Sequence, residues 1–114
     1  MRAYQKCVAW NATIAAPEDA LQDAFIRRVY GNDNPYWIGV RKIVDRWMKP
    51  VQSKQFGYTL VNYTNWGSSQ PDGCCWYDVT CVVVNYGNTL GKWDDQDCYS
   101  YVRSAGAVCQ KQSL

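Results

Sequence analysis

Six cysteines in a chain of 114 residues limit the possible folds more than any other feature of this sequence. That many cysteines in so short a chain indicate an oxidising compartment and a disulfide framework, although spacing alone does not choose the pairing. Two N-x-[ST] sequons, at Asn11 and Asn62, fit the same interpretation. We therefore expect a secreted, N-glycosylated protein.

The length and the net charge of the chain narrow the class of protein further. A chain of this size predicts a single domain over residues 1–114, with a modest core. The net charge of +2, with no stripe of Lys and Arg, argues against a nucleic-acid partner. We find no apolar stretch long enough to span a membrane and no signal peptide at Met1, so we expect a mature or recombinant piece.

A first helix is expected over residues 2 to about 11. Ala3, Cys7 and Trp10 would share one face of it, because they recur at helical spacing. Cys7 would then point inward, ready for a disulfide bond. A short extended link, residues 13–15, is expected to follow.

A second helix is expected over residues 17–30. Pro17 suits a first helical position, and Gly31 suits the position just after a helix. The helix should turn an apolar stripe toward the core, made of Leu21, Phe25 and Val29.

The rest of the chain predicts short strands and one long loop. β-branched and aromatic runs indicate strands at 36–40, 58–63, 81–85, 90–93 and 105–110. Gly39 should lie where another backbone approaches closely. Residues 67–78 form a long loop, and such loops in compact domains are usually functional. Four tryptophans could form a ligand-stacking set but more simply fill the core, namely Trp37, Trp47, Trp66 and Trp93.

Oxygen-bearing side chains gather around the long loop. Gln70 and Asp72 lie in it, Asp94 and Asp95 follow it, and Asp78 stands between the two groups. Carboxylate and amide oxygens suit calcium, whereas the absence of histidine argues against zinc. The Gln70–Pro71 bond could be cis, which would turn the flanking side chains toward one point. Ordinary surface charge is the alternative explanation for these acids.

Several short motifs occur together in an order that resembles the C-type lectin-like domain, in particular its calcium-dependent sugar-binding members. The resemblance covers essentially the whole chain, and the matching segments are 37–40, 65–66, 70–72, 81–82, 93–95 and 108–109. It implies an α+β fold in which two helices flank antiparallel strands and a long loop binds calcium. Domains of this family generally begin with a strand that pairs with the last one. Here that strand is absent, so the last strand has a bare edge or a partner covers it.

The resemblance also implies disulfide bonds. Cys7 would pair with Cys109, and Cys81 with Cys98, each bond contributing about 2–4 kcal/mol. Cys74 and Cys75 are left over. They form a vicinal disulfide, stay free, or bridge to another chain.

In the family, the amide-Pro-acid triplet and a Trp-Asn-Asp triplet supply ligands to one calcium ion, which binds two vicinal sugar hydroxyls directly. Gln70, Asp72, Asp94 and Asp95 match those positions. Asp78 matches a further ligand, although the segment from it to the next cysteine is one residue longer than usual.

The Gln-Pro-Asp order is associated with galactose and N-acetylgalactosamine. Gln70, Asp72 and Asp94 would contact the sugar, and Trp76 or Tyr77 would stack on its apolar face. Trp76 could equally pack beneath the loop. Asp94 departs from the family, which has Asn there; an aspartate deletes a hydrogen-bond donor, so calcium would bind more tightly and sugar more weakly.

These observations predict a binding protein and not an enzyme. Without histidine, a Ser or Cys nucleophile lacks its usual base, and adjacent Asp94 and Asp95 do not form the opposed carboxylates of a glycosidase. We expect a calcium-dependent lectin for galactose-type glycans, clustered as a homo-oligomer for avidity. The alternative is a relative that binds protein or ice surfaces, with calcium only stiffening the loop.

Overall fold

The computed structural model describes residues 2–51, 57–74, 78–87, 89–99 and 105–111. It contains two helices, α1 (Arg2–Ala9) and α2 (Ala20–Tyr30). The strands are β1 (Ala12–Ile14), β2 (Tyr36–Ile43), β3 (Arg46–Pro50), β4 (Tyr58–Leu60), β5 (Val79–Val84), β6 (Trp93–Asp97), β7 (Gly106–Ala107) and β8 (Cys109–Lys111).

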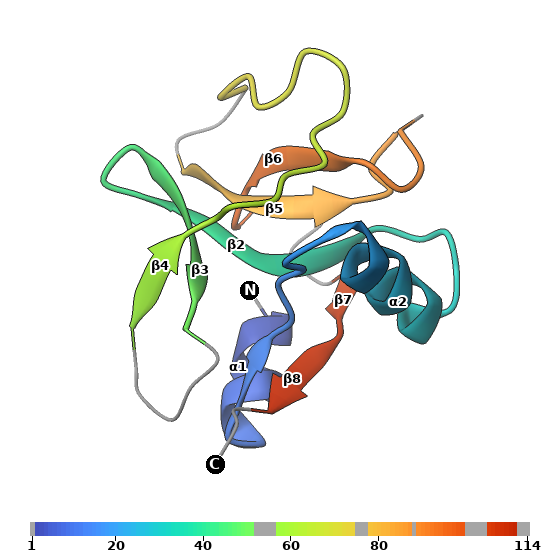
Figure 1. The fold of residues 1–114 in the computed structure, drawn as a ribbon, viewed down its shortest axis with the longest axis vertical. Helices are drawn as coiled ribbons and strands as arrows, with labels where there is room; N and C mark the ends of the chain where they lie inside the picture. Colours follow the sequence, from blue (N-terminus) through green and yellow to red (C-terminus); the bar gives the residue numbers. More distant parts are fainter. Residues whose placement is uncertain (1, 52–56, 75–77, 88, 100–104, 112–114) are drawn as a thin grey trace.

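The strands form two sheets, and the α+β class expected from the sequence is confirmed. The larger sheet has the order β4-β3-β2-β5-β6 with antiparallel neighbours, and β7 runs parallel to the start of β2. The smaller sheet pairs β1 with β8. Figure 1 shows the long loop after β4 at one end of the molecule and α1 with β8 at the other.

The first helix is shorter than expected. Ala3 and Cys7 are buried as predicted, and Cys7 forms the expected disulfide with Cys109. Because the helix ends at Ala9, Trp10 leaves the helical face and its side chain is 62% exposed. The prediction that Trp10 shares a helical face with Ala3 and Cys7 is therefore wrong.

The second helix begins three residues after the predicted position. Asp19 is its N-cap, and its carboxylate accepts a hydrogen bond from Gln22 N at 2.8 Å. Pro17 thus precedes the helix instead of opening it. Gly31 ends the helix as predicted, in the left-handed region at φ 88°, and its N–H donates to the Arg27 carbonyl.

The face that α2 turns inward also differs from the prediction. Its apolar stripe points to solvent, with Leu21, Phe25 and Val29 exposed by 84%, 55% and 53%. Asp23 and Ile26 are buried instead. The Asp23 carboxylate accepts hydrogen bonds from the Tyr63 hydroxyl and the Asn65 amide, and Ile26 packs in the core. These tertiary partners are invisible to a periodicity argument.

Gly39 is the point of close backbone approach that the sequence predicted. Its N–H donates to the Ala15 carbonyl at 2.9 Å, and a Cβ atom at position 39 would collide with the Ile14 carbonyl oxygen. The link after α1 is therefore held against β2, and as strand β1 it also pairs with β8.

The end of the chain is two short strands instead of the one predicted at 105–110. Val108 separates β7 from β8, and its carbonyl accepts a hydrogen bond from Ala15 N at 2.8 Å. In the described part of the chain, β8 is paired by β1, a strand that follows α1 and does not precede it.

The strand predicted at 90–93 lies further along the chain. Residues 89–92 form a turn in which Lys92 N donates to the Thr89 carbonyl and Gly91 N donates to the Asn85 side chain. Strand β6 begins only at Trp93. As a result, the acids that follow Trp93 lie within a strand and not in a loop.

The tryptophans fill the core, as the simpler interpretation predicted. Trp37 and Trp93 are fully buried, and Trp47 and Trp66 pack against the cluster that contains Trp93. The Trp66 ring lies edge-on to both neighbouring rings, with centroids 4.9 Å from Trp47 and 5.5 Å from Trp93. Among the described residues, neither helix has the length and hydropathy needed to cross a membrane.

Candidate metal and ligand site

Three of the acids singled out in the sequence come together in space. Asp72, Asp94 and Asp95 each present one carboxylate oxygen, and the three oxygens lie within 4.8 Å of one another. Asp72 belongs to the long loop, whereas Asp94 and Asp95 belong to β6. The cluster therefore joins the loop to the sheet.

The strand half of the cluster is rigidly placed. Asp94 and Asp95 pair with Val83 and Val82 of β5, and they follow the fully buried Trp93. Trp93 also holds the start of the loop, because its N–H donates to the Asn65 carbonyl at 2.8 Å and its carbonyl accepts from Gly67 N at 2.9 Å.

The loop half is fixed by hydrogen bonds to carboxylates. The two oxygens of Asp95 accept from Asp72 N at 3.1 Å and from Gly73 N at 2.8 Å. Asp72 in turn accepts from Cys74 N at 3.0 Å. The two bonds to Asp95 are charge-assisted and tie the loop backbone directly to β6, whereas the bond to Asp72 stays within the loop.

Gln70 completes the cluster, and the Gln70–Pro71 bond, which the sequence left open, is cis. One end of its side-chain amide lies 2.7 Å from Asp94 Oδ1, 2.9 Å from Asp95 Oδ1 and 3.2 Å from Asp72 Oδ1. With the amide nitrogen there, two N–H protons face three acceptors. With the amide oxygen there, four oxygens converge, and a bound cation would offset their mutual repulsion.

Negative charge at this site is not neutralised by basic side chains. In the described ranges, no Lys or Arg forms an ion pair with the three carboxylates. Burial raises the pKa of Asp94, a hydrogen bond from Gln96 lowers it, and the neighbouring Asp95 and Asp72 raise it. Carboxylate and amide oxygens without a counter-charge fit a hard cation such as calcium.

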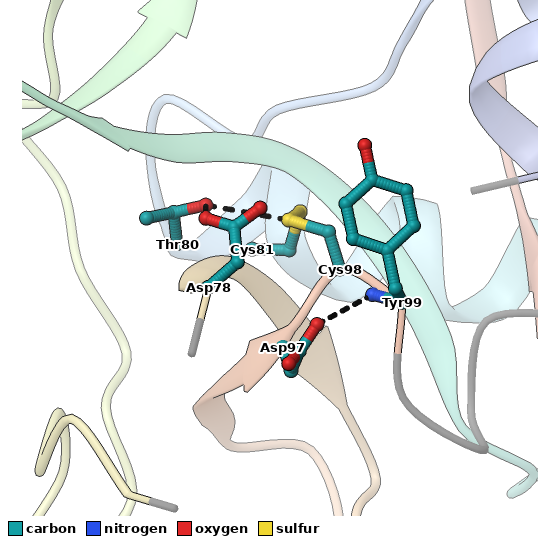
Figure 2. The surroundings of a disulfide bond; sticks show 6 residues. All are labelled: Asp78, Thr80, Cys81, Asp97, Cys98 and Tyr99. Atoms are coloured by element: carbon teal, nitrogen blue, oxygen red, sulfur yellow. Dashed lines mark hydrogen bonds between the residues drawn. A yellow bond between two sulfur atoms is a disulfide. The ribbon is translucent and has the colours of Figure 1, made fainter. Parts of the chain in front are cut away.

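Asp78 is not brought into this cluster. Its carboxylate accepts a hydrogen bond from the Thr80 hydroxyl at 2.9 Å, and its carbonyl accepts from Cys98 N. Figure 2 shows it beside the Cys81–Cys98 disulfide, near the start of β5. The acids of the cluster pair further along that strand.

The predicted disulfides and modification sites can be placed in part. Cys7–Cys109 and Cys81–Cys98 are both formed, and Cys74 also takes part in a disulfide. Both sequon asparagines are exposed, and Asn62 accepts a hydrogen bond from Lys49 Nζ at 3.4 Å. Three residues of interest lie outside the described residues, namely Cys75, Trp76 and Tyr77.

Sequence reasoning missed the side chains that support the cluster. Asn65 donates to Asp23 Oδ2 at 3.0 Å and to the Gly91 carbonyl at 2.9 Å, so it anchors the loop to α2 and to the turn before β6. Gln96 donates to Asp94 at 3.1 Å. Asn65 could have been found from its place in the matching segment 65–66, whereas no local sequence pattern indicates a supporting role for Asp23 or Gln96.

Comparison with known proteins identifies the class. The family model of the lectin C-type domain matches residues 1–111, so the chain belongs to the C-type lectin family. Lectin BRA-3 of Megabalanus rosa is 36% identical over 88 residues, which are 77% of this chain and 50% of that protein. The match thus spans half the length of this curated relative.

Solved structures agree on the fold. The carbohydrate-recognition domain of the mouse scavenger receptor C-type lectin superimposes with a TM-score of 0.70 at 19% identity, over 99% of this chain and 80% of that one. Herring type II antifreeze protein superimposes with a TM-score of 0.62 at 25% identity, over 85% of this chain and 72% of that one. The C-type lectin fold expected from the motifs is therefore confirmed.

Proposed function

We propose that this domain binds carbohydrate through a calcium ion held by Gln70, Asp72, Asp94 and Asp95. The single observation that supports this most is the convergence of the Gln70 amide with three carboxylates, at distances of 2.7–3.2 Å, without a basic partner among the described residues. Asp78 is left out of this ligand set, because its carboxylate is bonded to Thr80 instead.

Calcium would supply open coordination positions for two sugar hydroxyls, and the protein side chains would orient the sugar around it. Gln70 accepts and donates hydrogen bonds, whereas Asp72 and Asp94 only accept. This order supports terminal galactose or N-acetylgalactosamine as the preferred ligand, with Trp76 or Tyr77 stacking on the sugar. Asp94 lowers the affinity, because it offers no donor to a hydroxyl.

We further propose that residues 1–114 act as one secreted, N-glycosylated binding domain, with Asn11 and Asn62 as acceptors, and not as an enzyme. The disulfides at Cys7–Cys109 and Cys81–Cys98 favour an oxidising compartment. Single sites of this kind bind weakly, so a homo-oligomer would supply avidity for galactose-type glycans.

A glycan array run in calcium and again in EDTA tests the proposal. We expect galactose-terminated signals that vanish in EDTA. A blank array, combined with a melting temperature that calcium still raises, would leave calcium as a structural ion and reject the sugar.

A second function is favoured by one finding. Type II antifreeze proteins share this fold, including one described as Ca2+-dependent, with a TM-score of 0.65 at 23% identity. The alternative is therefore a domain that binds a protein or ice surface, with calcium stiffening the loop.

Asp94→Asn separates the two functions, because it restores an amide donor while keeping an oxygen in the cluster. A lectin should gain sugar affinity or change its specificity. A surface-binding domain should give no sugar response with either residue. Thermal hysteresis, measured on both proteins, reports the ice-binding alternative directly.

A further inference from the structure

A cleft of about 400 Å³ lies away from the acidic cluster. It is bounded by α1 and β1 on one side and by β2 with the facing ends of β3 and β4 on the other. The residues that matter to its chemistry are Tyr4, Val8, Ile38, Arg41, Tyr58 and Tyr99.

Arg41 is the charged residue of this cleft, and its guanidinium lacks a partner in the described structure. It lies on β2 opposite Cys81 of β5, and its side chain is half-buried. The Nε atom is buried, yet it makes no hydrogen bond to any described group. Buried polar atoms are nearly always hydrogen-bonded in proteins, so the unpartnered Nε shows that the described neighbours leave the hydrogen-bonding capacity of this guanidinium unused. The side chain also lines the cleft, where its positive charge is available to a ligand.

No described residue that lines the cleft is acidic. Much of the remaining wall is apolar, formed by side chains such as Val8 and Ile38 together with the Cys81–Cys98 disulfide, although Asn11 and Thr13 also line it. Three tyrosine rings stand at the wall and are partly exposed, by 48% for Tyr4, 42% for Tyr58 and 67% for Tyr99. Tyr99 directly follows the disulfide, as Figure 2 shows.

We propose that this cleft binds a small amphipathic carboxylate, with the carboxylate on Arg41 and a flat apolar body between the tyrosine rings. A guanidinium matches a carboxylate with paired N–H donors, and one uncompensated positive charge suits one negative charge. A largely apolar wall with exposed tyrosine rings suits an aromatic or short aliphatic body.

Binding here is independent of the acidic cluster. The cleft shares no described residue with Gln70, Asp72, Asp94 or Asp95, so calcium should not be needed. This separates failure of the cleft from failure of the lectin proposal, because the two sites respond to different ligands and different variants.

Titration of the 15N-labelled protein with 2-naphthoate, followed by amide NMR shifts, tests the inference. The uncharged 2-naphthamide serves as the matched probe. Protein made without N-glycans is used, because Asn11 also lines the cleft. We expect saturable shifts at Tyr4, Thr13, Arg41 and Tyr58, in calcium and in EDTA alike, and at least about tenfold weaker binding of the amide.

Two variants assign the site. Arg41→Gln should reduce naphthoate affinity to that of the amide probe, whereas Arg46→Gln, a change at an exposed arginine of β3, should leave it unchanged. If Arg41→Gln does not fold, Val8→Trp provides the second test: this half-exposed position on α1 lines the cleft, and a larger ring should fill it and abolish binding.

Three results would overturn the inference. Equal affinity for naphthoate and naphthamide would show that the negative charge of the carboxylate does not contribute to binding. Unchanged naphthoate affinity in Arg41→Gln or Val8→Trp would show that the probe does not bind in this cleft. Shifts confined to the exposed apolar face of α2, at Leu21, Phe25 and Val29, would show that the probe binds that face instead.

Discussion

At the scale of single residues, two positions tolerate little change. Gly39 has no room for a side chain, because the Ile14 carbonyl oxygen occupies the place of its Cβ. Tyr63 donates its hydroxyl proton to the buried Asp23 carboxylate at 2.9 Å. Position 39 is restricted by steric contact, whereas the contribution of Tyr63 depends on its hydroxyl proton, so different experiments test them.

We expect Gly39→Ala to lower the free energy of unfolding by about 2–3 kcal/mol, because the new methyl group pushes β1 away from β2. Urea denaturation measures the loss. Gly67→Ala is the matched control, since a Cβ there lies 3.5 Å from the nearest atom, an ordinary contact. Equal losses in both variants would contradict the close approach at position 39.

The ionisation of Tyr63 gives a pH prediction. Burial, then the hydrogen bond to Asp23, raises the pKa of Tyr63 to about 12. An unfolded tyrosine has a pKa of about 10, so the folded state holds this proton more tightly. The resulting stability is complete below about pH 10 and is lost as pH rises from 10 through 12.

Urea denaturation between pH 9 and pH 12 measures this loss, and Tyr63→Phe should flatten it, because the variant has no proton to lose at that position. Ring 13C NMR shifts of Tyr63 report the ionisation directly. An unchanged pH profile in Tyr63→Phe would rule out the linkage.

At the scale of elements, α2 shows how tertiary partners override a sequence pattern. Its spacing of Leu21, Phe25 and Val29 predicts an inward stripe, yet Asp23 and Ile26 are buried. An acid in the first turn of a helix, like Asp23, usually faces solvent. Here its Oδ2 atom accepts hydrogen bonds from Tyr63 and Asn65, which lie 40 and 42 positions away, and no local rule foresees them. Its Oδ1 atom is buried without a partner among the described groups.

Two substitutions on α2 test which face is buried. Ile26→Ala should lower the free energy of unfolding by about 2–4 kcal/mol, because Ile26 is only 7% exposed. Leu21→Gln, at a site 84% exposed, should change it by about 0.5 kcal/mol or less. Thermal or urea denaturation gives both values, and the reverse ranking would restore the orientation predicted from periodicity.

The parts of the fold that were predictable carry strong local signals. Gly31 marked a helix end, Gly39 marked a close approach, and the run of valines after Cys81 marked a buried strand. The family resemblance pointed to Asp72, Asp94 and Asp95, which do cluster, and also to Asp78, which does not. Strand β6 was misplaced because Leu90–Trp93 has strand-like composition, whereas the Asn85–Gly91 hydrogen bond makes a turn.

At the scale of the whole molecule, covalent bonds close two loops of different length. Cys7–Cys109 spans a sequence separation of 102 residues, and Cys81–Cys98 spans 17. In the chain-entropy model, a longer loop removes more freedom from the unfolded state.

Replacing both members of each pair by alanine should therefore give unequal losses. We expect about 4–5 kcal/mol for Cys7 with Cys109 and about 3 kcal/mol for Cys81 with Cys98. Cys7, Cys81 and Cys98 are all buried, so both double variants also lose core packing. Urea denaturation ranks the two, and a larger loss from the shorter loop would contradict the entropic account.

Calcium should stabilise the whole fold if it binds the acidic cluster. At a concentration 100 times its dissociation constant, we expect a gain of about 2.7 kcal/mol over EDTA. Asp95→Asn should abolish the gain and speed amide hydrogen exchange at Asp72 and Gly73, which donate to its oxygens. Asp97→Asn, on the same strand outside the cluster, should keep the gain; no calcium response in the unmodified protein would reject the site.

The division of the acidic cluster between a strand and a loop has a consequence for engineering. Asp94 and Asp95 directly follow the buried Trp93 on β6, so they cannot be moved without disturbing the core. In the loop, by contrast, Ser68, Ser69 and Pro71 are exposed and are not part of the core. A library of loop segments that retains oxygens at positions 70 and 72 could therefore be grafted onto an unchanged framework. Selection would then act on what the site recognises, with the rest of the protein as a constant scaffold.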